Sequence, residues 1–375
     1  MYASIKNELQ QELNALKEAG LYKSERIIVS PQWAEITVQN GREVLNFCAN
    51  NYLGLSSHPE VIKAAHEALE THGFGLSSVR FICGTQDIHK ELERQTAAFV
   101  GAEDCILYAA AFDANGGVFE PLLGEEDAII SDELNHASLI DSIRLATVIK
   151  KGLLKDIYKN NLLEGEKSLR AALERAKANP EMKGQIWVVT DGVFSMEGEY
   201  ANLQEFVEMA KTNDALLFVD ESHSTGVLGA TGRGTPEHCG VHGKIDVISG
   251  TLGKALGGAA GGFIAGKKHL IDFMRQKSRP YTFSNSLPPA IVAAAIEALN
   301  ILEEDSSLVE KLHQNTDYFR KEVKRLGFTI LEGIHPIVPV MVGEAATAMD
   351  MSNQLLEQGV YVRRSEEHTS ELQSH

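Results

Sequence analysis

A lysine in a glycine-rich segment is the residue best suited to covalent chemistry. Lys254 lies in the segment Ser249–Gly258 and follows the apolar run Val247–Ser249, which is typical of a buried strand. An amine becomes nucleophilic when burial or a nearby cation lowers its pKa, and small neighbouring residues let a flat ring approach. The alternative is a nucleotide phosphate loop, which needs glycine where this chain has Ile248 and Ser or Thr where it has Ala255. That alternative therefore fails.

A carboxylate and a histidine lie close together at the end of another predicted strand. Asp220 directly follows the apolar run Ala215–Val219, and His223 comes three residues later. An aspartate at the end of a buried strand can pair with a pyridinium nitrogen and keep it protonated, so that the ring accepts electrons from a carbanion. An isolated aspartate at such a place more often caps the next helix. The choice between these roles depends on the residues that accompany Asp220.

Three more segments place polar groups directly after predicted strands. Ala111 and Phe112 begin the segment Ala111–Gly117, whose free backbone N–H groups could hold a phosphate at the start of a helix. His136 could stack on an aromatic ring, and Ser195 could donate a hydrogen bond to a phenolate oxygen. A capped helix start, a structural histidine and a turn serine are the ordinary alternatives. Each of these segments alone is therefore weak evidence.

The order of these features along the chain is stronger evidence than any one of them. The phosphate-binding segment, His136, Ser195, Asp220 and Lys254 follow the ends of successive predicted strands. Because the carboxyl ends of parallel strands meet at one edge of a sheet, these groups can surround one ligand. The sequence lacks the zinc-protease, hydrolase-elbow and complete dinucleotide motifs. We therefore predict a pyridoxal phosphate (PLP) site in which Lys254 carries the cofactor as a Schiff base, and no metal site.

The elements that must position these residues are short apolar strands alternating with helices. Such strands are typical of a mainly parallel sheet that is buried on both faces. They are predicted at 105–108, 128–130, 186–189, 215–219, 247–249 and 262–265. Helices are predicted near the N-terminus up to Gly20 and at 59–71, 87–100, 289–304, 307–326 and 344–358. The other predicted strands are 33–38, 44–47, 328–331, 337–341 and 360–362.

These elements predict an α/β fold with a large cofactor-binding domain and a smaller α+β domain. Residues 1–44 are expected to form an N-terminal helix and arm, and residues 45–288 the large domain. Residues 289–362 are expected to form the small domain, incomplete at its C-terminal side. Residues 363–375 are polar and lack a pattern that could face a core, so we interpret them as a tail that is not native.

Charge and cysteine content limit the expected partners and location. The formal net charge of −17 over 375 residues argues against nucleic acid or an anionic membrane as a partner. The four cysteines are far apart and lack the Cys-x-x-Cys spacing, so we expect free thiols rather than disulfides or a zinc site. No apolar run is long enough to span a bilayer, and the N-terminal segment lacks the core of a signal peptide. The expected location is the cytoplasm.

Taken together, the motifs resemble those of the α-oxoamine synthases, which are fold-type I PLP enzymes that condense a small amino acid with an acyl-CoA. The resemblance extends over nearly the whole chain to Val362. It is carried by Asn46–Leu55, Ser78–Asp87, Phe112–Gly117, Asp132–Ser138, Asp191–Gly198, Val219–His223, Thr251–Gly258 and Arg279–Leu287. The first two segments favour members that join glycine and acetyl-CoA to give 2-amino-3-oxobutyrate and CoA, a reversible reaction of threonine breakdown to glycine.

The resemblance implies roles for the residues around the cofactor ring. Lys254 would hold the cofactor and move protons at the glycine Cα, and Asp220 would pair with the pyridine nitrogen. His136 would stack on the ring, while His223 and Ser195 would contact its phenolic oxygen. These implied roles make Lys254, His136 and Asp220 the expected catalytic residues.

The resemblance also implies a site shared between two subunits. The residues expected to hold the phosphate are Ala111, Phe112 and Thr251. Family members are homodimers with a shared active site, so Ser284 and Asn285 are expected to reach the phosphate in the neighbouring subunit. Asn50 is expected near the substrate, with glycine and acetyl-CoA as the small-molecule partners.

Two stretches depart from the family pattern. Residues 146–165 do not match it, and the strand expected there is poorly defined. The family also has an arginine near its C-terminal end that clamps the amino-acid carboxylate, and Arg363 and Arg364 do not fit that motif. A bidentate arginine orients the substrate, so we expect this polypeptide to bind PLP but to turn over poorly.

Alternatives remain within and outside this reading. The sister enzymes that make 8-amino-7-oxononanoate or 5-aminolevulinate share the motifs and release the carboxylate as CO2. A homologue that binds PLP but is catalytically impaired is the alternative of another class.

Overall fold

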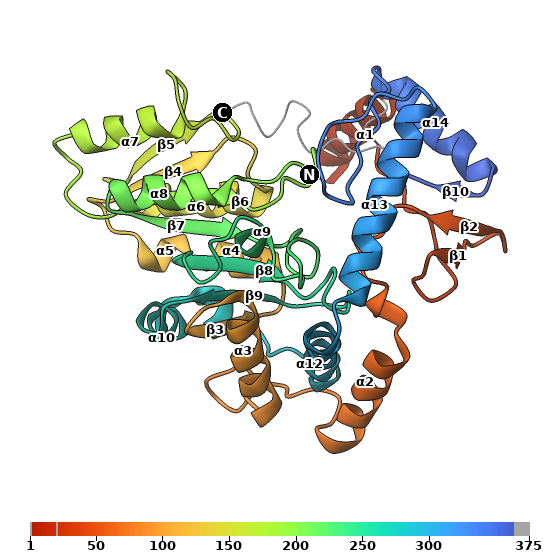
Figure 1. Cartoon of the computed structure of the whole chain (residues 1–375), viewed down its shortest axis with the longest axis horizontal. Coiled ribbons are helices and arrows are strands. Elements are labelled where there is room, and N and C mark those ends of the chain that lie inside the picture. The colour runs from red at the N-terminus through yellow and green to blue at the C-terminus, as the bar shows by residue number, and fades with distance from the viewer. Residues whose placement is uncertain (1, 20–21, 364–375) are drawn as a thin grey trace.

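A seven-stranded sheet forms the centre of the molecule (Figure 1). The computed structural model describes residues 2–19 and 22–363. The strands are β3 (Asp104–Tyr108), β4 (Ala128–Asp132), β5 (Leu154–Tyr158), β6 (Ile186–Asp191), β7 (Ala215–Asp220), β8 (Val247–Thr251) and β9 (Gly262–Gly266). Their order across the sheet is β3-β9-β8-β7-β6-β4-β5. Only β9 runs antiparallel to its neighbours, so the predicted mainly parallel sheet is confirmed.

Helices cover both faces of this sheet, which explains why its strands are apolar almost throughout. All six residues of β6 are buried, as are all five residues of both β4 and β9. The covering helices are α4 (Ala111–Gly116), α5 (Phe119–Leu122), α6 (Ala137–Ile149), α7 (Leu169–Ala178), α8 (Leu203–Thr212), α9 (Thr235–His238), α10 (Lys268–Lys277) and α11 (Arg279–Phe283). Because neighbouring strand residues point to opposite faces, two separate hydrophobic clusters result.

A second region is formed by segments that come before the large sheet in the sequence and by segments that come after it. Its elements are η1 (Leu55–Ser57), α2 (Pro59–Thr71), α3 (Asp87–Val100), α12 (Pro289–Glu304), α13 (Ser307–Arg325) and α14 (Ala345–Glu357). Helix α12 packs against α2 and α3. A three-stranded sheet contains β1 (Glu35–Thr37), β2 (Glu43–Asn46) and β10 (Val360–Tyr361), and Leu45 of β2 pairs with Val360. The N-terminal arm therefore shares a sheet with the end of the described chain, and the predicted domain boundaries remain a prediction.

Several expected elements agree closely with the structure, and others need correction. Helices α2, α3 and α12 have the predicted bounds. The predicted strands at 328–331 and 337–341 are wrong: only a single bridge joins Ile330 and Val340. Pro336 and Pro339 lack an N–H, and the guanidinium of Arg320 takes the carbonyls of residues 331, 335 and 337, so this segment cannot form a ladder. The first predicted strand, 33–38, shortens to β1.

The stretch 146–165 contains the end of α6 and the edge strand β5. Its sequence signal was weak because β5 lies at the edge of the sheet and alternates exposed with more buried residues. Lys155 and Asp156 consequently interrupt the apolar run that buried strands show. An edge position therefore explains the poorly defined pattern.

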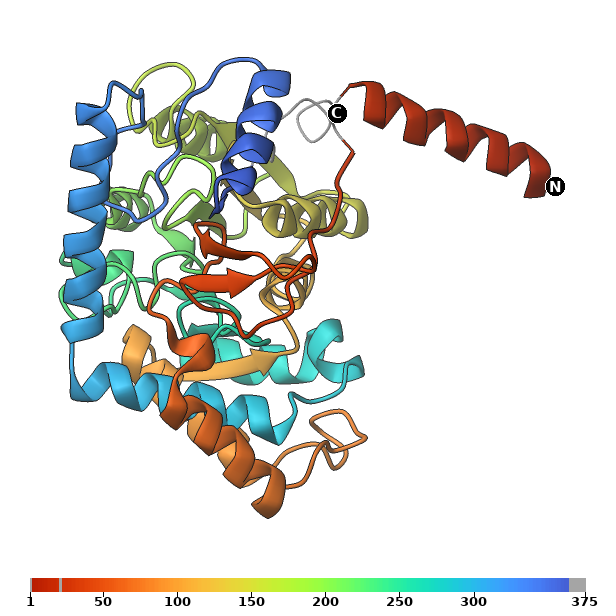
Figure 2. The same cartoon turned by 90° about the vertical axis from the view of Figure 1, so that its right-hand side faces the viewer.

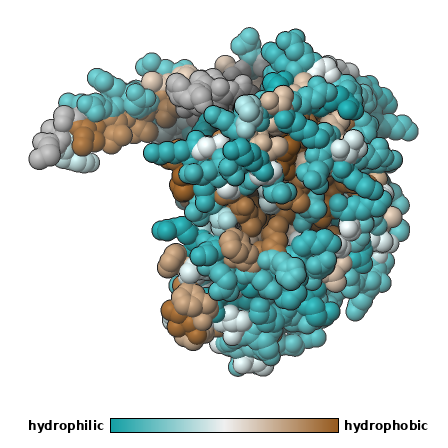
Figure 3. Space-filling view, turned by 90° about the vertical axis from the view of Figure 1, so that its left-hand side faces the viewer, coloured by the Kyte–Doolittle hydropathy of each residue, from teal (hydrophilic) through white to brown (hydrophobic). Residues whose placement is uncertain are grey.

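Helix α1 (Tyr2–Glu18) extends away from the rest of the chain (Figure 2). Ile5, Leu9, Leu13 and Leu16 are all exposed, and the protruding helix carries a brown apolar strip in Figure 3. The predicted helix is confirmed, while Gly20, the residue expected to end it, lies outside the described residues. An apolar strip of this kind is the face by which an amphipathic helix normally packs.

Candidate active site

The carboxyl edge of the large sheet brings three aspartates together. Asp132, Asp191 and Asp220 end β4, β6 and β7, and each is at most 5% exposed. The register pairs Asp191 with Asp220 directly and Asp220 with Ser249 of β8. The sequence predicts this convergence for Asp220, because parallel strands end at a common edge.

Asp220 is fixed in place by two donors. Asn115 Nδ2 donates to Asp220 Oδ2 at 2.6 Å, and the backbone N of Ser222 donates to Oδ1 at 2.8 Å. Asn115 Nδ2 also lies 2.9 Å from Ser138 Oγ, so the α4 segment, the α6 start and β7 share one network. Asp220 is 4% exposed, and a carboxylate this deep needs hydrogen bonds or a cation. Its position suits a partner for a positively charged ring nitrogen.

His136 lies at the start of α6, where it caps the helix. Its Nδ1 accepts from the backbone N of Ser138 at 3.2 Å, and its own backbone N donates to Asp191 Oδ2 at 3.1 Å. Because Nδ1 accepts, Nε2 carries the ring proton. The Phe112 ring meets the His136 ring edge-on, with centroids 6.5 Å apart. The structure thus places His136 beside the predicted phosphate-binding segment.

Lys254 follows β8 and contacts an imidazole. Lys254 Nζ lies 2.7 Å from His223 Nε2, and His223 Nδ1 lies 2.9 Å from the Tyr52 hydroxyl. Burial and the positive charge of Lys254 hold the pKa of His223 well below its usual value, so this ring is neutral. Lys254 and His223, which the sequence assigns to different atoms of the cofactor, are therefore in direct contact.

The predicted phosphate-binding residues border one another beside β9. Ala110 bridges to Gly261, and a Cβ on Gly262 would lie 2.4 Å from the Ala111 nitrogen and Cα. Thr251 Oγ1 accepts from the backbone N of Gly253 at 3.0 Å and donates to the carbonyl of Gly261 at 3.3 Å. Only glycine lets the start of α4 approach the strand this closely. The cradle fits the group that the sequence predicts.

The remaining predicted residues occupy three other places. Ser195 is partly buried in the turn between the bridged residues Val193 and Tyr200, after β6. Asn50 is exposed, and its Oδ1 accepts from the Tyr52 hydroxyl at 3.2 Å. Ser284 and Asn285 follow α11, and Asn285 is exposed. Their expected contact with a neighbouring subunit remains a prediction, as do the individual roles of the other site residues.

Four further residues contribute to the site without having been assigned a role from sequence. Tyr52, Asn115 and Asp191 lie inside segments whose neighbouring residues carry the sequence motifs. His335 gave no signal, because only folding brings it to the site. Its Nε2 lies 2.8 Å from the carbonyl of His223, and burial lowers its pKa to about 4.

The two aspartates beside Asp220 have pKa values above the usual range. Burial, followed by the charges of Asp220 and Asp132, raises the pKa of Asp191 well above normal. Burial also raises the pKa of Asp132 to about 6, against the opposing donors Leu134 N, Asn161 N and Asn160 Nδ2. The raised pKa of Asp191 favours its protonated form, which limits the like-charge repulsion on Asp220.

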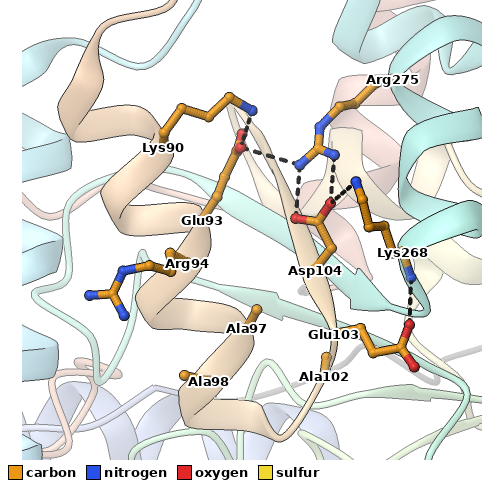
Figure 4. A pocket seen from close by; sticks show the side chains of 10 residues that line it. All are labelled: Lys90, Glu93, Arg94, Ala97, Ala98, Ala102, Glu103, Asp104, Lys268 and Arg275. Atoms are coloured by element: carbon orange, nitrogen blue, oxygen red, sulfur yellow. Dashed lines mark hydrogen bonds and ion pairs between the residues drawn. The ribbon is translucent and has the colours of Figure 1, made fainter.

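A surface pocket of about 460 Å³ lies between α3 and α10 (Figure 4). We call its ion pairs the Arg275 cluster, which comprises Arg80, Lys90, Glu93, Asp104, Lys268, Asp272 and Arg275. Arg275 binds Asp104 through both terminal nitrogens, at 2.7 and 3.0 Å. Glu93 receives Arg80 at 2.7 Å and Lys90 at 2.6 Å. Cations and carboxylates alternate here, as in a structural network.

The last described residue, Arg363, contacts the N-terminal arm. Arg363 Nη2 donates to the carbonyl of Ser24 at 2.9 Å, so this side chain lies against the N-terminal arm. The other residues of the predicted tail, 364–375, and the expected loss of a carboxylate clamp lie outside the described residues.

Within the described ranges, every helix is too short or too polar to cross a membrane.

Comparison with known proteins places the chain in a class and then in a family. The architecture is that of fold-type I transferases: a serine palmitoyltransferase from Sphingomonas wittichii superposes with a TM-score of 0.85 at 30% identity, over 97% of this chain and 89% of that one. The family model for aminotransferase class I and II matches residues 42–373. The chain therefore belongs to the aminotransferase class I and II family.

Three curated relatives are more similar to this chain in sequence than that serine palmitoyltransferase is. The 2-amino-3-ketobutyrate coenzyme A ligase of Escherichia coli K12 is 50% identical over 96% of this chain and 88% of its own length. The mitochondrial ligase of the same name from Homo sapiens is 49% identical over 96% of this chain and 83% of its own length. An 8-amino-7-oxononanoate synthase from Thermoanaerobacter pseudethanolicus is 43% identical over 95% of this chain and 87% of its own length.

Proposed function

We propose that the chain is a PLP-dependent acyltransferase that joins glycine and acetyl-CoA to give 2-amino-3-oxobutyrate and CoA, and that also runs in reverse. The observation that carries this proposal is the juxtaposition of Lys254 and buried Asp220 at the end of neighbouring strands, in a chain 50% identical to a 2-amino-3-ketobutyrate coenzyme A ligase. The sister synthase is the more distant relative at 43% identity.

The residues present fit the cofactor. When bound, PLP supplies an electron-withdrawing ring that weakens the Cα–H bond of an attached amino acid. Asp220, oriented by Asn115, would hold the ring nitrogen as a cation, and the start of α4 with Thr251 would hold the phosphate. His136 would lie against the ring. His223 and Ser195 would serve its phenolic oxygen.

Lys254 performs the proton chemistry in this proposal. Its Nζ would attach the cofactor and would hold the proton removed from glycine Cα. His223 is neutral and lies 2.7 Å from Nζ, so it can accept a hydrogen bond from the amine without adding a competing charge. The buried loop residues Leu252, Ala255 and Leu256 exclude water from the base of this loop.

The decisive experiment separates cofactor attachment from turnover. We expect the protein loaded with PLP to show a visible absorbance band that changes in Lys254→Ala, with CoA release from glycine and acetyl-CoA falling at least roughly 10³-fold. Lys244→Ala is the matched control, because Lys244 is exposed and lies outside the site. An unchanged band in Lys254→Ala would overturn the enzyme proposal, while CO2 release or a preference for long acyl-CoA would favour a sister synthase.

The proposal includes a homodimer, supported by the unpaired apolar face of α1. Ile5, Leu9, Leu13 and Leu16 are exposed in the single chain, and an isolated helix of this length is only marginally stable in water. Exposed Phe283 beside Ser284 would lie at the same interface if the site is shared.

Charge placed on the apolar face of α1 tests the dimer. We expect Leu9→Glu with Leu13→Glu to raise the dimer dissociation constant at least about tenfold, because two apolar contacts are replaced by charges. Sedimentation velocity measures this change. Asn7→Glu with Gln11→Glu adds the same charge to the opposite face of α1 and should leave dissociation nearly unchanged. Equal effects of the two pairs would remove α1 from the interface.

The proposed location is the cytoplasm. Cys48, Cys83, Cys105 and Cys239 are free thiols, which suits a reducing compartment. The name of the human relative includes the word mitochondrial, which is the competing location for this enzyme class.

A further inference from the structure

Tyr52 lies in a hydrogen-bonded chain that starts at the reactive lysine and ends at an exposed side chain. Lys254 Nζ is 2.7 Å from His223 Nε2, and His223 Nδ1 is 2.9 Å from the Tyr52 hydroxyl oxygen. That hydroxyl is 3.2 Å from Asn50 Oδ1, and Asn50 is exposed. The series therefore connects the amine with the surface through two side chains, His223 and Tyr52.

We propose that Tyr52 is a positioning residue that decides which ring nitrogen of His223 carries the proton. In the chain without cofactor, the hydroxyl of Tyr52 accepts from Nδ1–H of His223 and donates to Asn50 Oδ1. Nε2 then presents a lone pair to Lys254. The inference goes beyond the proposed function, which assigns no role to Tyr52.

The assignment follows from counting donors and acceptors along the chain. Asn50 Oδ1 can only accept, so the single proton of the Tyr52 hydroxyl must serve it if that contact is a hydrogen bond. The hydroxyl oxygen then accepts, which requires a proton on His223 Nδ1 and leaves Nε2 without one. The Lys254 amine has an N–H to donate to Nε2 in both of its protonation states. Only this arrangement forms all three hydrogen bonds at once.

The surroundings of His223 keep the ring neutral and its plane fixed. The titratable groups that act on it are Lys254, His335 and His136, each of which lowers the pKa of His223, together with the Tyr52 hydroxyl that it contacts. Burial raises the pKa of Tyr52, so its proton is retained. A doubly protonated imidazole is therefore disfavoured, and the choice lies between two neutral tautomers.

His335 restrains the same ring from another element. The backbone N of Ile337 donates to His335 Nδ1 at 3.0 Å, so Nε2 carries the proton and donates to the carbonyl of His223 at 2.8 Å. The ring of His335 also meets the Tyr52 ring edge-on, with centroids 5.6 Å apart. His335 and Tyr52 therefore hold His223 by its backbone and by its ring, and only Tyr52 touches the nitrogen whose protonation is in question.

The hydroxyl of Tyr52 can also reverse its role, since it can donate as well as accept. If His223 serves an anionic phenolic oxygen, as the proposed function holds, Nε2 must carry the proton and Nδ1 must accept from Tyr52. A tyrosine permits both states of the ring. A phenylalanine leaves Nδ1 without its partner in either state.

Nitrogen-15 NMR of the full-length chain freed of cofactor tests the proposal. Solid-state spectra of protein labelled with ¹⁵N-histidine distinguish protonated from unprotonated ring nitrogens, and the His223→Gln spectrum identifies the signals of His223. We expect the Nδ1–H tautomer in the natural sequence. In Tyr52→Phe we expect the ratio of Nδ1–H to Nε2–H to fall by roughly five- to tenfold, the size expected for one hydrogen bond.

A second variant, Asn50→Leu, should also lower the ratio of Nδ1–H to Nε2–H at His223, for a different reason. Asn50→Leu removes the acceptor at the far end, so the Tyr52 hydroxyl proton is released to donate to Nδ1, and the proton of the ring should move to Nε2. Tyr318→Phe is the matched control, because Tyr318 is 69% exposed on α13, and it should leave the ratio unchanged.

The outcomes separate this inference from the proposed function. Nε2–H in the natural sequence, or a ratio that neither Tyr52→Phe nor Asn50→Leu changes, would overturn the role of Tyr52. The measurement needs neither PLP nor substrate. A failed acyltransferase assay therefore does not affect it, and a failed tautomer assignment leaves the acyltransferase proposal intact.

Discussion

Two groups of charged residues in this molecule differ in how their charges are balanced. In the Arg275 cluster, each carboxylate faces cations, and Glu93, which is 2% exposed, contacts three of them. At the sheet edge, Asp191 and Asp220 are neighbours in register, and Lys254 faces a neutral imidazole. In the first group every carboxylate is paired with cations, whereas the second places two buried aspartates side by side at the edge where Lys254 contacts His223. The unbalanced group is the better candidate for chemistry.

Asp220→Asn is the strongest test of this difference, because it removes the charge proposed to hold the cofactor ring. We expect kcat/KM for glycine to fall roughly 10²- to 5 × 10³-fold, the factor for losing one partner of a buried charge pair at about 3–5 kcal/mol. Steady-state assays at saturating PLP measure it. Asn115 Nδ2 and Ser222 N bond different oxygens of Asp220, and the amide keeps one oxygen as an acceptor, so circular dichroism checks the fold of the variant. A variant with full activity would mean that the edge carboxylate is structural after all.

Arg275→Met should lower the stability of the protein and leave its activity unchanged, the reverse of what we expect for Asp220→Asn. It removes the cation shared by Asp104 and Glu93, so we expect the free energy of unfolding to fall by about 3 kcal/mol while kcat is unchanged. Denaturant titration and assays at 25 °C give the two values. Lys268→Met is the control, because its side chain is 61% exposed, and it should change stability by about 0.5 kcal/mol or less. A large loss of kcat in Arg275→Met would mean that the Arg275 cluster also contributes to activity and is not purely structural.

Asp191→Asn sharpens the comparison within the sheet edge and should have the smallest effect at neutral pH. The pKa of Asp191 is raised on folding, so above its ordinary value the native state holds a proton that the unfolded state has lost. Stability therefore falls as pH rises through this window. Asn is neutral throughout and should weaken that fall, so the variant should gain on the natural sequence as pH rises from the ordinary aspartate pKa toward the raised pKa of Asp191. If the free energies of unfolding of the two proteins change with pH in the same way, Asp191 does not hold a raised pKa in the native state.

The sequence was informative where a residue follows a strand buried on both faces. Lys254, Asp220 and His136 could be located because apolar runs marked their strands and because parallel strands end together. The edge strand β5 gave a weaker pattern, since Lys155 is exposed and the charged Asp156 is only partly buried. The segment 328–341 was wrongly assigned to strands, because its apolar residues suggested a ladder that its prolines and Arg320 prevent.

The contacts of the site with distant segments could not be predicted from local pattern. His335 reaches the carbonyl of His223 across 112 positions of the sequence, and Tyr52 reaches the ring across 171. No periodicity encodes such a meeting, since it depends on how α13 and the segment after it pack. The role of Asn115 could not be predicted for another reason. It lies in the segment whose backbone N–H groups are predicted to bind phosphate, and its side chain instead donates to Asp220.

The three-stranded sheet of β1, β2 and β10 has a consequence for how the protein is made. Leu45 pairs with Val360, which leaves the ribosome about 300 residues later, roughly 15–60 s at bacterial and eukaryotic synthesis rates of about 5–20 residues per second. The strands of the large sheet, which end at Gly266, have all been synthesised by then. Strand β2 therefore lacks its partner β10, and its edge stays unpaired, through most of translation. A nascent chain stalled before Val360 would carry a complete central sheet and an unfinished small one.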